Sequence, residues 1–121
     1  MIYRLPLYHP IMKSLDREML HGHAETLLLA LLANGEGYGY QLRKDLALRS
    51  KHYFQFSFGS LYPTLRTLEK CGLACARWVN ARGVREHKQY VITAKGLKEL
   101  AARKGKWRQF SSAMDRVLSP P

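Results

Sequence analysis

Residues 57–69 of this 121-residue chain are SFGSLYPTLRTLE, and this stretch carries the clearest structural signal in the sequence. Leu61, Leu65 and Leu68 fall at helical spacing within it. This spacing predicts a helix over about Gly59–Cys71, with one narrow apolar face turned towards a core.

The start and the outer face of this helix have their own pattern. Ser57 and Ser60 are both candidate N-caps, and Pro63 suits the first turn. The face opposite the leucines carries small, polar or basic residues, which are Gly59, Pro63, Arg66, Thr67 and Lys70, with Tyr62 at the flank.

Two more helices precede this one. Leucines from Leu20 to Leu32 predict a helix that starts near Asp16 and ends at Asn34-Gly35. After a glycine-rich turn, a second helix is expected over about Tyr38–Leu48, with a loop behind it. No internal repeat and no second domain is recognised.

A β-hairpin and a long helix follow. Leu73–Val79 and His87–Thr93 are strand-like, and the polar loop between them contains Gly83. Thr93 is expected to cap a helix over Ala94–Leu118. The order predicts a mainly α fold with a small β-hairpin wing, a winged helix-turn-helix. We expect an irregular leader at residues 1–15, a winged-helix DNA-binding domain at 16–93 and a dimerisation helix at 94–118.

Positive charge points to a polyanionic partner. The net charge is +11, and the basic side chains concentrate between Arg43 and Arg108. Within the hairpin, Glu86 is the single acid among the bases Arg77, Arg82, Arg85, His87 and Lys88. The like charges of such a loop repel one another unless phosphates neutralise them. The outer face of the third helix, taken alone, is better explained as an ordinary solvated surface.

The segment 57–69, followed by Gly72-Leu73, resembles the recognition-helix signature of PadR-like transcriptional regulators. Residues 28–32 and 38–42 resemble the first two helices of that family, and residues 90–93 with Gly96 resemble its second wing strand and the following turn. The resemblance covers about Leu20 to Leu118. It implies a homodimer that binds an inverted-repeat operator, usually as a repressor. The wing sequence VREHKQY at 84–90 departs from the family's pattern at Glu86 and His87.

The resemblance implies DNA contacts at Tyr40, in the third helix and in the wing, and the residue types add further candidates. Tyr40 fits core packing equally well. The full set of expected DNA-binding residues is Tyr38, Tyr40, Lys44, Ser57, Ser60, Tyr62, Pro63, Thr64, Arg66, Thr67, Lys70, Arg82, Arg85 and Lys88.

The final helix carries an apolar stripe that suits pairing with a second subunit, although Lys104 and Ser111 interrupt it. Packing on the first helix of the same chain is the alternative, and we expect both. The predicted dimer interface comprises Leu20, Leu27, Leu97, Leu100, Trp107, Phe110, Met114, Val117 and Leu118. A flat aromatic effector beside Trp107 is a weaker hypothesis than plain interface core.

The sequence shows no set of residues typical of a catalytic site, so we do not expect an enzyme. We also expect no cofactor and no metal. Cys71 and Cys75 are interpreted as small buried residues with free thiols in a reducing cytoplasm. No membrane span is expected. The sequence thus predicts a sequence-specific DNA-binding regulator of transcription. The alternative is a winged-helix module that modulates a partner protein without specific DNA binding.

Overall fold

The computed structural model describes residues 18–20, 22–35, 37–79 and 87–121. Its elements, in chain order, are α2 (Ala24–Leu32), β1 (Gly37–Tyr38), α3 (Gly39–Arg49), α4 (Phe58–Lys70), β2 (Ala74–Val79), β3 (His87–Ile92) and α5 (Ala94–Leu118). The mainly helical fold, the wing strands and the long last helix are confirmed. The expected leader and the tip of the hairpin lie outside the described residues.

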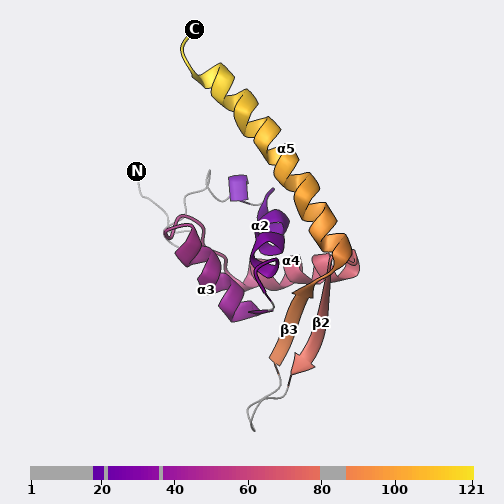
Figure 1. The fold of residues 1–121 in the computed structure, drawn as a ribbon. Helices are drawn as coiled ribbons and strands as arrows, with labels where there is room; N and C mark the ends of the chain where they lie inside the picture. The colour runs from indigo at the N-terminus through magenta and orange to yellow at the C-terminus, as the bar shows by residue number, and fades with distance from the viewer. Residues whose placement is uncertain (1–17, 21, 36, 80–86) are drawn as a thin grey trace, which may run out of the picture.

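The core lies where α2, α3 and α4 meet the sheet. Its most deeply buried side chains are Leu28, Leu29, Leu32, Leu61, Leu65, Leu68 and Tyr90. Each leucine buried in this way contributes about 1.5–3 kcal/mol relative to an exposed one. In Figure 1, β2 and β3 extend away from the helices, while α5 rises from the sheet and projects beyond the other helices. Among the described residues, much of α5 therefore has no neighbour from the other elements.

The first predicted helix is not continuous. Residues 18–20 are helical, Gly22 and His23 form a turn, and α2 begins at Ala24. The His23 N–H donates to the carbonyl of Leu20 at 2.9 Å, which closes this turn. Glycine is a poor helix former, and here its effect exceeds that of the leucine periodicity.

The sheet has three antiparallel strands in the order β1-β3-β2, whereas the sequence predicts a two-stranded hairpin. Strand β1 is only two residues long, and Gly37 pairs with Tyr90 while Tyr38 pairs with Gln89. The N–H of Tyr38 also donates to Gln41 Oε1 at 3.4 Å. Strand β1 thus attaches the start of α3 to the wing.

Helix α4 starts one residue earlier than expected. Ser57 is the N-cap, and its Oγ accepts the Ser60 N–H at 3.2 Å. Pro63 consequently lies in the second turn rather than the first. Because proline has no N–H, the carbonyl of Gly59 lacks its usual donor four residues on.

Helix α5 begins at a tight junction with the end of α4. Thr93 Oγ1 donates to the carbonyl of Gly72 at 2.7 Å and accepts the Gly96 N–H at 2.9 Å. Lys95 Nζ donates to the carbonyl of Cys71 at 2.9 Å. The predicted Thr93 cap is confirmed. Cys71 and Cys75 are both free but exposed, so the prediction that they are buried was wrong.

Candidate nucleic-acid interface

Helix α4 has the two faces that the sequence predicts. Its three leucines at the core are fully buried. The opposite face is exposed to solvent along its length, through Gly59, Tyr62, Pro63, Arg66, Thr67 and Lys70. This face is available to a partner.

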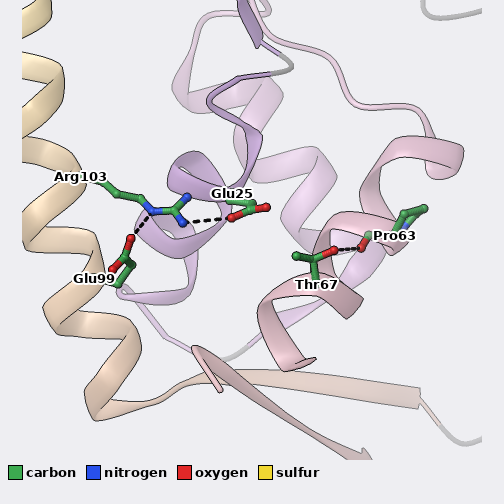
Figure 2. A network of polar contacts seen from close by, with 5 residues as sticks. All are labelled: Glu25, Pro63, Thr67, Glu99 and Arg103. Atoms are coloured by element: carbon green, nitrogen blue, oxygen red, sulfur yellow. Dashed lines mark hydrogen bonds and ion pairs between the residues drawn. The ribbon is translucent and has the colours of Figure 1, made fainter. Parts of the chain in front are cut away.

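The threonine hydroxyl groups of α4 donate hydrogen bonds to carbonyls of the same helix. The Thr64 hydroxyl donates to the carbonyl of Ser60 at 2.8 Å, and the Thr67 hydroxyl donates to the carbonyl of Pro63 at 3.1 Å (Figure 2). The Ser57 and Ser60 Oγ atoms lie 3.1 Å apart at the cap. Because a phosphate accepts hydrogen bonds and donates none, both threonines would have to rotate to contact one. Arg66 and Lys70 are the donors that need no such change.

A cleft lies between α4 and the wing. It measures about 500 Å³ and is lined by Pro63, Arg66, Thr67, Glu69, Lys70 and Lys88. Lys88 is 18 residues from Lys70 in the chain, and strand β3 brings it to the recognition-helix side. Cations from two elements thus line one concave surface, and such cations can neutralise phosphates.

One carboxylate lies among these cations. Glu69 Oε1 is 3.3 Å from Lys88 Nζ. Partial burial lowers the pKa of Lys88, but the hydrogen bond to Glu69 and the attraction of Glu69 and Tyr90 outweigh it, so the pKa lies above its usual value of 10.5. Lys88 is therefore a cation throughout the physiological pH range.

Exposed aromatic rings surround the starts of α3 and α4. Tyr40 is 58% exposed and stacks on Tyr38 with ring centroids 6.4 Å apart, so the alternative that Tyr40 packs in the core was wrong. Lys44, further along α3, is also exposed. The ring of Tyr62 occupies space that a Cβ at Gly39 would fill, since that atom would lie 2.6 Å from the Tyr62 hydroxyl. Glycine at this position lets α3 and α4 approach closely.

Sequence reasoning missed Phe58, the first residue of α4. Its ring is 48% exposed and stacks on Tyr62 at 6.0 Å. The guanidinium of Arg43 lies 4.5 Å from the ring centroid, and Arg43 Nε donates to the carbonyl of Phe56 at 2.7 Å. An apolar ring at the N-terminal end of such a helix suits contact with thymine methyl groups. Its position directly after the candidate cap Ser57 was the feature of the sequence that could have pointed to this residue.

The wing is described only in part. Arg82 and Arg85 lie outside the described residues. Arg77 on β2 is exposed, and its Nε donates to Gln89 Oε1 at 2.9 Å. Within the described part of the chain, Arg66, Lys70 and Lys88 are thus the basic residues gathered at the cleft.

The residues expected at the interface between two subunits fall into a buried group and an exposed group. Leu20 and Leu100 are only 5% and 4% exposed, so they belong to the core of the chain and we remove them from the expected subunit interface. Leu27 is partly buried against the same core. The remaining residues of the stripe on α5 are all exposed, and they are Leu97, Trp107, Phe110, Met114, Val117 and Leu118.

The first half of α5 is tied to α2. Arg103 lies 3.1 Å from Glu25 and 2.7 Å from Glu99, and forms an ion-pair network between the two helices (Figure 2). The ring of Trp107 contacts His23 edge-on at 5.1 Å and lies 5.9 Å from the ring of Phe110. Beyond this point the apolar side chains of the stripe, Met114, Val117 and Leu118, are exposed.

Across the described ranges, no helix combines the length and apolar character needed to cross a membrane. The same part of the chain contains no group of three or more His, Cys, Asp or Glu side chains placed to hold a metal ion.

Comparisons with known proteins agree with this geometry. The family model of the transcriptional regulator PadR-like family matches residues 28–102. A PadR family transcriptional regulator from Eggerthella lenta is 30% identical, with a TM-score of 0.78, over 89% of this chain and 92% of its own. A PadR-like transcriptional regulator from Bacillus cereus is also 30% identical, with a TM-score of 0.73, over 86% and 99%. A transcriptional regulator from Clostridium thermocellum, 21% identical over 90% and 100%, has a similar fold, with a TM-score of 0.79.

Proposed function

The chain belongs to the PadR-like family of transcriptional regulators, and from this membership we propose that it binds a specific operator as a homodimer and represses transcription in a bacterial-type cytoplasm. It is a DNA-binding regulator rather than an enzyme. The observation that carries the proposal is the cleft in which Arg66 and Lys70 of α4 meet Lys88 of β3. Repression would follow from occupation of the promoter by the bound dimer.

In the proposed complex, the exposed face of α4 enters the major groove. In this arrangement, Arg66 would donate two hydrogen bonds to a guanine edge. Lys70 and Lys88 would bind phosphates on either side of the groove, and Tyr40 and Lys44 would contact the backbone from α3. The wing residues Arg82 and Arg85 are assigned to further phosphate contacts.

The proposed dimer forms through the uncovered stripe on α5. An exposed apolar stripe of this length is typical of a protein interface. Two-fold symmetry would hold two copies of α4 about 34 Å apart, which matches successive major grooves on one side of a duplex. We do not extend the proposal to an aromatic effector beside Trp107, because pairing of the stripe already accounts for the exposure of that ring.

The decisive experiment is selection of bound sites from a pool of random duplexes. The proposal expects one enriched inverted repeat whose half-sites lie one helical turn apart. Transcription from a promoter that carries the repeat should fall when the protein is added. An enriched pool without symmetry would contradict the dimer, and no enrichment would contradict specific binding.

Operator binding is expected to depend steeply on salt. Each subunit offers five candidate phosphate-binding cations, which are Lys44, Lys70, Arg82, Arg85 and Lys88. The logarithm of the association constant should therefore fall with the logarithm of the salt concentration, with a slope steeper than about −4. Titrations of the duplex at several salt concentrations measure this slope. A flat dependence would favour the alternative function, a module that modulates a partner protein.

Replacing Arg66 with alanine is expected to weaken sequence discrimination about tenfold, because the guanidinium is the side chain assigned to a base edge. The measurement is the ratio of affinities for the selected operator and for a duplex with one altered half-site position. Lys70→Ala is the matched control and should weaken binding to both duplexes alike. Equal loss of affinity for both duplexes in the Arg66 variant would reassign Arg66 to the backbone.

A further inference from the structure

An ion pair crosses the cleft from α4 to the wing. Glu69 stands near the end of α4 and Lys88 on β3, and their charged atoms lie 3.3 Å apart. Lys88 Nζ also lies 5.5 Å from the centroid of the Tyr90 ring. Arg66 and Lys70 line the same cleft. Among the described residues, Glu69 is thus the one carboxylate that lines this cleft, together with three cations.

This carboxylate competes with DNA for Lys88. A carboxylate and a phosphate are both anionic acceptors for the same ammonium group, and they repel each other. While the pair is formed, the charges of Lys88 and Glu69 cancel, so the two side chains together add no net positive charge to the cleft. Both side chains are partly exposed, at 32% and 38%, and a pair with this exposure adds little to folding stability. Its main effect is on the charge that the cleft presents to DNA.

We propose that Glu69 limits the affinity of the protein for DNA of arbitrary sequence by holding Lys88 away from the phosphate backbone. The inference rests on the proposed DNA-binding function and adds a restraint to it. When a duplex docks loosely, the pair stays intact and Lys88 makes no phosphate contact. Close docking of α4 brings a phosphate near enough to displace the carboxylate. Glu69 is therefore a positioning residue that acts through Lys88.

The test compares Glu69→Gln with the intact protein, using a duplex of mixed sequence that lacks the selected operator. The variant should bind this duplex about fivefold more tightly, and its salt slope should be steeper by about 2 per dimer, since one lysine per subunit gains a phosphate contact. The Lys88→Gln background should abolish the gain, so that Glu69→Gln changes affinity there by less than about twofold. Thermal unfolding of each variant checks that it is folded.

Asp115→Asn provides the matched control, because it removes one negative charge at an exposed position near the end of α5. It should leave the affinity for the same duplex unchanged. The proposal is overturned if Glu69→Gln binds as the intact protein does, or if its gain persists without Lys88, which would mean that the carboxylate acts only by its own charge. If the intact protein binds no duplex at all, the proposed function itself fails.

Discussion

A chain carrying Phe110→Glu is expected to be a monomer and to bind its selected operator about 10²- to 10⁴-fold more weakly, because the two half-sites are then bound independently. Phe110 is exposed in the middle of the stripe on α5. In the proposed dimer, symmetry would bury two carboxylates in an apolar interface, which is strongly unfavourable. Sedimentation equilibrium measures the mass, and duplex titration measures the affinity.

The position makes this variant informative, because Phe110 is exposed and lies on the helix that projects beyond the others (Figure 1). A charge there leaves the core of the chain untouched, so the folded monomer should keep its helical content. Gln109→Glu is the matched control, because Gln109 is exposed on the side of α5 away from the stripe. A Phe110→Glu protein that remains dimeric would place the interface elsewhere.

The second large effect is expected from Gly96→Ala, which should lower the free energy of unfolding by about 3 kcal/mol. A Cβ at Gly96 would lie 2.1 Å from the carbonyl oxygen of Leu73 and 2.7 Å from Ile92 Cγ1. That oxygen also accepts the N–H of Thr93 at 3.1 Å, so it cannot move aside without loss of the junction. Chemical denaturation at one fixed protein concentration measures the change.

Gly105→Ala is the control for this variant and should raise the free energy of unfolding instead of lowering it. Gly105 lies in the same helix, and nothing stands within 4 Å of its added Cβ. Alanine should therefore stabilise the helix there by about 0.5–1 kcal/mol, because glycine is a poor helix former. A Gly96→Ala protein as stable as the original would show that α5 can move away from Leu73.

The long, strongly periodic elements could be predicted from the sequence. The spacing of Leu61, Leu65 and Leu68 predicted the buried face of α4, whose observed bounds differ from the expected ones by one residue at each end, and α5 has the predicted bounds Ala94–Leu118. Local signals suffice for such elements, because a helix makes its hydrogen bonds within itself. Strand β1 has no such signal, since its two residues are defined by a partner more than fifty positions away.

The errors at the site have a related cause. Periodicity shows which face of a helix is apolar but not what covers it, so the sequence could not separate Leu20 and Leu100, which are buried within the chain, from the exposed residues of the same stripe. Cys75 is exposed because it alternates with the buried Ala74 on β2. The Glu69–Lys88 pair depends on how the wing lies against α4, so no pattern along the chain reveals it.

The hydrogen bonds from Thr93 and Lys95 to the carbonyls at the end of α4 fix the start of α5 against that helix. The recognition helix is fastened at one end of α5, a rod of about 37 Å at 1.5 Å per residue. In the proposed dimer, a change of a few degrees in the angle between the two α5 helices would move the two α4 helices by several ångströms. The range of half-site spacings that the dimer can bind then depends on how rigid the interface between the two α5 helices is, although that interface lies far from the bases.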